Sequence, residues 1–203
     1  MGGTETQRPS VRDAALQATR ERILDAAADA WRRQWYDDVT LRAIARDAGV
    51  ALQTVVNHFG TKEALFLATA ERIGEGIAAR RWVVAAGDVE HALEVLVADY
   101  EDNGDATVRN LAVEEKVPEV GPMIDLGRRG HEAWCEHCFA GALDGLRGAE
   151  RRRRLAQLVA VTDVYTWKIL RRDKGLSQAQ VRTAMRELVL ALHQTTDTEG
   201  EAP

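Results

Sequence analysis

Apolar positions recur at three- and four-residue spacing in nearly every window of the chain, which is the period of a helix with one buried face. No segment shows the alternating, β-branched pattern that is typical of strands. Only four prolines occur in 203 residues, so helices can continue with few interruptions. The pattern therefore predicts an all-α protein.

The first third of the chain predicts four helices. Thr40 and Thr61 can each cap a helix, because a threonine hydroxyl accepts hydrogen bonds from the free amides of a first turn. Gly49 can end the second helix, since it has no Cβ to oppose a left-handed turn. The expected helices cover about residues 18–34, 41–48, 52–58 and 62–82, and the first has an apolar stripe of Ile23, Leu24, Ala27 and Trp31.

Beyond Gly87 the chain predicts a larger helical body. Pro118 to Pro122 interrupt the helical pattern, and Gly175 stops it again. Ser177 with Gln180 forms a capping box that opens the last helix. The expected helices cover about residues 88–102, 107–116, 123–140, 150–172 and 178–192.

The segment from Thr40 to Val50 joins a capped amphipathic helix to a glycine turn, and another helix follows at once. This order predicts a helix-turn-helix, whose second helix enters the major groove of DNA. The exposed positions of that helix are expected to be Leu52, Gln53, Val56 and Asn57. Amide side chains match the donor and acceptor of adenine, and apolar side chains can contact a thymine methyl. Hydroxyl, imidazole and ammonium groups at the groove edge, on Thr54, His58 and Lys62, can donate to phosphates.

Three stretches of sequence make this reading more specific. They are Arg20-Glu21-Arg22-Ile23-Leu24-Asp25-Ala26-Ala27, Leu41 to Gly49, and Val50 to Leu65, which contains Asn57-His58-Phe59-Gly60-Thr61-Lys62-Glu63. Together they resemble the TetR/AcrR family of transcriptional regulators over roughly the first third of the chain. The resemblance implies that Arg42 contacts a base or phosphate and that Thr54, His58 and Lys62 contact the DNA backbone. The full predicted DNA-binding set is Thr40, Arg42, Leu52, Gln53, Thr54, Val56, Asn57, His58 and Lys62.

Two positions depart from the family pattern. Val56 stands where a tyrosine is usual, which removes one phosphate or thymine contact, and Trp35 replaces the usual glycine before Tyr36. DNA affinity is therefore expected to be modest or to depend on other contacts.

The formal net charge of −5 is unevenly distributed along the chain. Through Lys62, nine Lys and Arg stand against eight Asp and Glu, whereas the remaining residues have a net charge of −6. A local basic patch on an acidic protein can still bind phosphates, because local charge decides such contacts. The patch is expected to contain Arg8, Arg12, Arg42, His58 and Lys62.

The sequence divides into an arm, a head, a body and a tail, with the boundary of head and body inside the fourth helix. A flexible arm is expected over residues 1–17, the helix-turn-helix domain over 18–66, a ligand-binding and dimerisation domain over 67–194, and a disordered tail over 195–203. No stretch reaches the roughly 20 apolar residues of a membrane span, and the N-terminus lacks a secretory signal. A cytoplasmic protein is expected.

The resemblance implies a homodimer and a small-molecule effector that shifts the fourth helix and changes the distance between the two DNA heads. Two apolar stripes suit a four-helix dimer interface, formed by Leu155, Leu158, Val159, Thr162, Thr166, Ile169, Val181, Met185, Leu188, Val189 and Leu192. Both stripes can equally pack within one chain. The effector pocket is expected among Trp82, Tyr100, Met123, Trp134 and Tyr165, each of which can also be plain core.

Two alternatives to this ligand-released repressor stay open. His131, Cys135 and Cys138 recur at i, i+4 and i+7 on one helical face, which is compatible with a metal or thiol-redox sensor on the same scaffold. The other is a helical ligand-binding dimer that has lost DNA recognition. No cofactor is expected, and catalysis is not, because Cys135 and His137 point apart on a helix.

Overall fold

The computed structural model describes residues 10–194, and these contain helices and turns without strands, which confirms the all-α prediction. The expected tail, and residues 1–9 of the expected arm, lie outside the described part. The chain separates into two compact units between Ala70 and Glu71, inside helix α4 (Lys62–Arg81). No helix of the described residues is long and apolar enough to cross a membrane.

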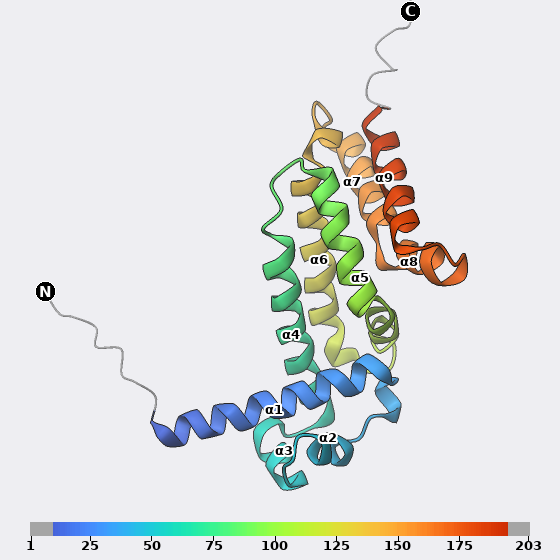
Figure 1. Cartoon of the computed structure of the whole chain (residues 1–203). Helices are drawn as coiled ribbons and strands as arrows, with labels where there is room; N and C mark the ends of the chain where they lie inside the picture. Colours follow the sequence, from blue (N-terminus) through green and yellow to red (C-terminus); the bar gives the residue numbers. More distant parts are fainter. Residues whose placement is uncertain (1–9, 195–203) are drawn as a thin grey trace, which may run out of the picture. The chain divides into compact units, whose positions relative to one another are not determined.

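The first unit contains α1 (Val11–Arg33), the short 3-10 helix η1 (Tyr36–Asp38), α2 (Leu41–Asp47), α3 (Leu52–Phe59) and the start of α4 (Figure 1). α1 begins earlier than predicted, so residues 11–17 are helical and not an arm. The cause is a capping box, in which the Ser10 hydroxyl accepts from the Asp13 amide and the Asp13 carboxylate accepts from the Ser10 amide.

The second unit contains α5 (Val89–Leu111), η2 (Pro118–Val120), α6 (Gly121–Cys138), η3 (Ala140–Leu143), α7 (Gly148–Thr162), α8 (Val164–Lys168), a π-helical turn η4 (Ile169–Asp173) and α9 (Gln178–Gln194). α5 packs against α8 and α9, and α6 packs against α7 (Figure 1). The predicted capping box opens α9, since Ser177 and Gln180 exchange both hydrogen bonds.

α5 is one continuous helix, whereas the sequence predicted a break after residue 102. Gly104, which lies in the expected break, is buried inside the helix. A Cβ at this position would lie 2.4 Å from Cζ3 of Trp167. Glycine is therefore present because the indole of α8 packs directly on the α5 backbone.

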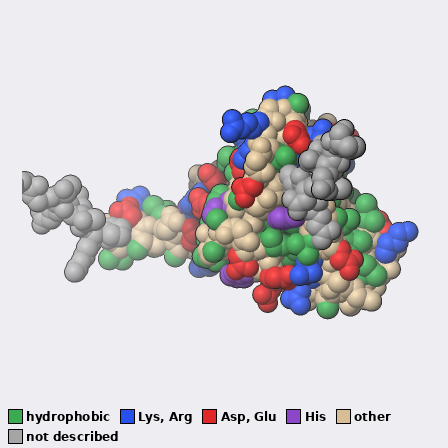
Figure 2. All heavy atoms as spheres, turned by 90° about the horizontal axis from the view of Figure 1, so that it is seen from above, with side chains coloured by type: hydrophobic (Ala, Val, Ile, Leu, Met, Phe, Trp, Pro, Cys, Tyr) green, Lys and Arg blue, Asp and Glu red, His purple; other side chains and the backbone are tan. Residues whose placement is uncertain are grey.

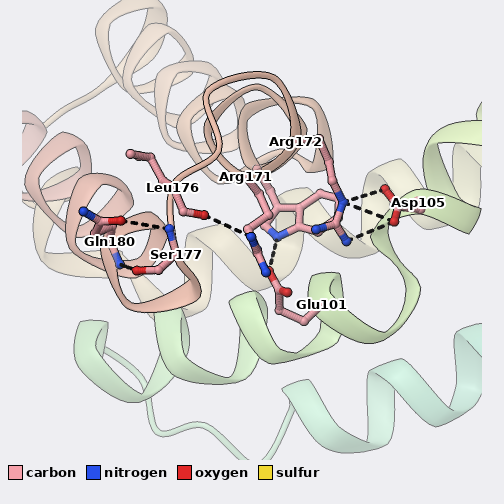
Figure 3. A network of polar contacts seen from close by, with 8 residues as sticks. Glu101, Asp105, Arg171, Arg172, Leu176, Ser177 and Gln180 are labelled. Atoms are coloured by element: carbon pink, nitrogen blue, oxygen red, sulfur yellow. Dashed lines mark hydrogen bonds and ion pairs between the residues drawn. The ribbon is translucent and has the colours of Figure 1, made fainter.

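The predicted single helix over 150–172 is also wrong. It breaks at Asp163, whose backbone is extended and whose carboxylate caps α8 by accepting from the Tyr165 amide. The π-helical turn that follows α8 turns Arg171 and Arg172 towards α5, where they pair with Glu101 and Asp105 (Figure 3). The expected continuous apolar stripe on this helix therefore does not exist.

Candidate nucleic-acid interface

The turn between α2 and α3 has the geometry that its sequence predicts. The Thr40 hydroxyl caps α2 by accepting from the Ala43 amide at 3.1 Å. Gly49 has φ +67°, and the Val50 amide donates back to the Ala45 carbonyl at 2.9 Å. These bonds end α2 and let α3 start three residues after the glycine, which gives a helix-turn-helix.

A compact core holds the two motif helices. Ile44 on α2 and Val55 on α3 are fully buried, as are Ile23 and Ala27 of the predicted stripe on α1. Three aromatic rings extend this core, since the Phe66 ring lies edge-on to Trp31 at 5.0 Å and to Tyr36 at 5.2 Å between centroids. Such edge-to-face pairs stabilise a packed arrangement beyond their buried area.

One face of α3 points away from this core. Leu52, Gln53, Val56 and Asn57 are all exposed, as predicted, with 38% exposure for Leu52 and 36% for Val56. The Gln53 side-chain amide donates to the Asn57 Oδ1 at 2.9 Å, so these two amides form a pair one helical turn apart. The face therefore presents a polar pair beside two apolar side chains.

Lys62 begins α4 directly after the Gly60-Thr61 link that follows α3. Its ammonium lies 4.2 Å from the centre of the Tyr36 ring, a cation–π contact that fixes the flexible side chain. The Tyr36 hydroxyl in turn donates to Glu63 at 3.1 Å. Burial lowers the Lys62 pKa from its ordinary value, and the nearby Asp37, Glu63 and Asp38 partly oppose that shift by favouring the charged form. The Lys62 ammonium is thus held in place at the start of α4.

The other predicted DNA-binding residues lie on the same unit. Arg42 and Thr40 are exposed at the start of α2, and Thr54 and His58 are half-buried on α3. The Thr40 hydroxyl accepts a hydrogen bond as a helix cap, and its own hydrogen can still be donated to a phosphate. Trp35, the departure before Tyr36, is 53% exposed and leaves the Tyr36 packing intact.

The charges of the molecule do not gather by sign on the face shown in Figure 2, where acidic and basic side chains are interspersed. Acidic and basic side chains also form ion pairs, for example Arg151 of α7 with Glu136 of α6. A net charge of −5 therefore does not preclude a local phosphate-binding surface on the first unit.

The second unit contains a buried polar cluster at the C-terminal end of α4. Arg81 donates to Asp99 at 2.9 Å, and Asp99 is only 4% exposed. The Arg81 guanidinium lies between the rings of Tyr100 and Trp134, at 5.3 and 5.4 Å from their centres. The Trp134 indole also donates to the Arg81 carbonyl at 3.1 Å, so side chains of α5 and α6 hold the end of α4.

His131 connects this cluster to α7. Its Nδ1 lies 3.4 Å from an Arg81 nitrogen, and because arginine only donates, Nδ1 accepts and Nε2 carries the proton. Nε2 lies 3.2 Å from the Thr162 hydroxyl, which itself donates to the Leu158 carbonyl. Burial first, and then the positive charge of Arg81, lower the His131 pKa to about 3.

This cluster contains a feature that sequence reasoning missed. Asp99 falls within the apolar stripe of α5, beside the buried Leu96 and Tyr100. A carboxylate on a buried helical face needs a cationic partner, and Arg80 and Arg81 at the end of the preceding helix are its partners. An acidic residue interrupting an apolar stripe was the signal that could have found it.

The five residues predicted to line an effector pocket differ in burial and in their contacts. Tyr100 and Trp134 flank Arg81 inside the unit, whereas Trp82 and Tyr165 are 49% and 48% exposed. Met123 is half-buried near the start of α6. Of the five, Tyr100 and Trp134 share a contact with one group, the Arg81 guanidinium.

The predicted dimer stripes need a similar correction. The apolar side chains of Leu155, Leu158, Val181, Met185 and Val189, together with Thr162, lie in the core of the chain and cannot face a partner. Val159, Thr166 and Leu192 are half-buried, and Ile169 and Leu188 are 49% and 42% exposed. Of the predicted stripe residues, these five are therefore accessible at the surface, as is the neighbouring Tyr165.

The candidate metal or redox set does not assemble. Cys135 and Cys138 are buried, and burial raises the pKa of both thiols to about 12, so both stay protonated. Cys135 lies 3.2 Å from the Thr162 hydroxyl and 3.6 Å from His131. Within residues 10–194, no three His, Cys, Asp or Glu side chains form a group that could hold a metal ion. Thiolates are the metal ligands and nucleophiles, so burial of these two thiols disfavours both roles.

Comparison with known proteins places the motif in a family. Residues 23–69 match the model for bacterial regulatory proteins of the tetR family. An HTH-type transcriptional repressor of Mycobacterium tuberculosis is 35% identical over 71 residues, a stretch that spans only 35% of this chain and 38% of that repressor.

Solved structures resemble the fold of nearly the whole chain. A tetR-family transcriptional regulator from Streptomyces coelicolor has a TM-score of 0.69 at 18% identity, over 87% of this chain and 83% of the other. The transcriptional regulator FadR from Bacillus subtilis, solved in complex with stearoyl-CoA, has a TM-score of 0.61 at 18% identity, over 84% and 97%. At these identities the likeness concerns the fold alone.

Proposed function

Because this chain is a transcriptional regulator of the TetR family, we propose that it is a cytoplasmic repressor that binds operator DNA as a homodimer and leaves it when a small-molecule effector binds. The observation that supports this proposal is the exposed face of α3, together with the Lys62 ammonium held at the adjoining start of α4. A helix in the major groove reads bases, and a fixed cation at its edge binds phosphate. The Mycobacterium tuberculosis relative is likewise described as a repressor.

The homodimer is proposed to form through α8 and α9 and the π-helical turn. Tyr165, Ile169 and Leu188 expose apolar side chains there, and Thr166 and Leu192 add partly covered ones. Two copies of the head would then read two half-sites about 34–36 Å apart, one turn of DNA. Size-exclusion chromatography with light scattering should give a dimer of twice the chain mass of 22.4 kDa. The Ile169→Glu variant should elute as a monomer with the mass of a single chain. A wild-type monomer would contradict this part of the proposal.

The effector is proposed to act through the buried polar cluster of the second unit. Arg81 is the last residue of α4, the helix that begins at Lys62, so a change in its contacts to Asp99, Tyr100 and Trp134 would move α4 and with it the head. A ligand shifts such an equilibrium only by its different affinity for the two states. FadR, of the same fold, was solved with stearoyl-CoA, which supports a small-molecule site in this type of fold.

Fluorescence anisotropy tests the DNA-binding part. Purified protein is titrated into a labelled duplex from the region flanking its coding sequence, and into a scrambled duplex, at several salt concentrations. We expect tight binding to the first duplex only. Equal, weak and salt-sensitive binding to this duplex and to duplexes selected from a random library would show a helical dimer that has lost DNA recognition.

Two charge-matched variants separate the role of Lys62 from an effect of net charge. Lys62→Ala should weaken binding to all duplexes and reduce the slope of log affinity against log salt by about one per protomer. Arg153→Ala, an exposed position on α7, should leave both unchanged. If the two variants behave alike, Lys62 does not contact phosphate.

A further inference from the structure

The Gln53–Asn57 pair limits what α3 can recognise. One amide hydrogen bond joins the two side chains, with Gln53 Nε2 donating to Asn57 Oδ1 at 2.9 Å. Each side-chain amide has one C=O and one NH₂ group. With Gln53 as the donor, its own C=O and the NH₂ group of Asn57 remain free. The pair therefore offers one acceptor and one donor group from a single, mutually oriented unit.

The two neighbouring side chains impose a second requirement. Leu52 and Val56 are one helical turn apart on the same exposed face, and more than a third of each side chain is uncovered. Neither can form a hydrogen bond, so against a base edge they favour an apolar group. In the major groove the only apolar group of that kind on an unmodified base is the C5-methyl of thymine.

A single type of base pair satisfies both requirements. Adenine presents a donor, N6, and an acceptor, N7, and its partner thymine presents the methyl group in the same groove. Guanine presents two acceptors, and a G·C pair has no methyl group. Building on the proposed operator binding, we propose that α3 reads an A·T pair in each half-site, with adenine bound by the Gln53–Asn57 pair and the thymine methyl packed on Val56 and Leu52.

This assignment gives Val56 a positive role. The family pattern has tyrosine at this position, whose hydroxyl can donate to a phosphate, and valine cannot. Valine can instead make an apolar contact with the methyl group, and this contact distinguishes thymine from cytosine. Because Val56 is exposed, its truncation to alanine leaves no cavity in the core, and Val56→Thr keeps its shape while adding a hydroxyl.

The test uses duplexes selected by the full-length protein from a random library. The aligned half-sites should contain an invariant A·T pair. Replacing its thymine by deoxyuridine removes one methyl group and should weaken wild-type binding about four-fold, from the transfer free energy of one such group. Val56→Ala should reduce this difference and the double variant with Leu52→Ala should abolish it, whereas Lys62→Ala should bind more weakly overall and keep the four-fold difference.

The amide pair is tested in the same assay. Replacing the adenine by 7-deazaadenine removes N7 and should weaken wild-type binding about ten-fold. Gln53→Ala and Asn57→Ala should each lose this discrimination, and the double variant should lose no more than either single one, since the pair acts as a unit.

The outcomes distinguish the two levels of the proposal. A selected consensus with an invariant G·C pair at this position, or an unchanged affinity for the deoxyuridine duplex, would overturn the A·T assignment while operator binding stands. Selection of no consensus at all would overturn the proposed function itself. Additive losses in the Gln53 and Asn57 variants would show that the two amides act separately, and would overturn the paired reading.

Discussion

Gly104→Ala is expected to destabilise the protein, although alanine favours a helix by about 1 kcal/mol over glycine. The new Cβ would lie 2.4, 2.7 and 2.8 Å from three ring atoms of Trp167. That ring is fully buried, its Nε1 donates to Glu101 at 3.1 Å, and the Arg172 guanidinium covers its face at 4.7 Å. The indole therefore has little freedom to move, and overpacking of this kind costs about 1–3 kcal/mol. At the upper end of that range, the net loss is about 2 kcal/mol.

Urea unfolding followed by circular dichroism measures this loss at one fixed protein concentration, because dimer stability depends on concentration. Gly130→Ala is the matched control. Gly130 is an exposed glycine inside α6, and a Cβ there would meet nothing within 4 Å. This control should be stabilised by up to about 1 kcal/mol through helix propensity alone.

A second substitution assigns the loss to the ring contact. In a Trp167→Phe background the outer part of the indole is gone, and Gly104→Ala should cost less there than in the wild type. If Gly104→Ala instead stabilises the protein as much as Gly130→Ala does, the close packing of α5 on α8 is not what requires glycine, and the reasoning fails.

Three further outcomes test the buried polar cluster. Asp99→Asn should cost about 3–5 kcal/mol in urea unfolding because it strands the buried Arg81 cation, whereas Asp105→Asn, in an exposed pair, should cost under about 1 kcal/mol. The pKa of His131 in the folded protein is about 3, so between pH 6.5 and 3 only the unfolded chain takes up a proton at this residue. The free energy of unfolding should therefore fall by about 2 kcal/mol on acidification from pH 6.5 to 5. His131→Gln should remove this part of the pH dependence. If the free energy of unfolding varied with pH equally in the wild type and the variant, His131 would not be a buried neutral imidazole. Both cysteine thiols should react with a thiol reagent only after urea is added, and immediate reaction of the native protein would revive the redox hypothesis.

The sequence predicted the fold best where period and capping decide the structure. The stripe of α1, the cap at Thr40, the turn at Gly49 and the capping box at Ser177 are local features, and each is present. Local hydrogen bonds and burial on one face do not depend on distant residues, so single-sequence reasoning reaches them.

Prediction from the sequence failed where a residue far along the chain determines the local conformation. Gly104 stays helical because Trp167, 63 positions further along the chain, packs on it, and Asp163 breaks a helix that its neighbours would continue. Apolar period also cannot tell a dimer face from a core face, so Leu158 and Met185 were assigned to the interface although both are fully buried. The exposed face of α3 was predicted correctly, but the bond between Gln53 and Asn57 was not.

The magnitudes in the buried cluster limit how an effector can act. Moving a two-state equilibrium from 1:99 to 99:1 takes about 5.5 kcal/mol of differential affinity. Cation–π contacts such as those of Arg81 with Tyr100 and Trp134 contribute about 0.5–2 kcal/mol each, whereas breaking a buried ion pair costs about 3–5 kcal/mol. An effector that changed only one ring contact would leave most of the protein bound to DNA. We therefore propose that a full release changes the pair between Arg81 and Asp99 together with the ring contacts, and that an effector offering its own carboxylate to Arg81 would offset the loss of that pair.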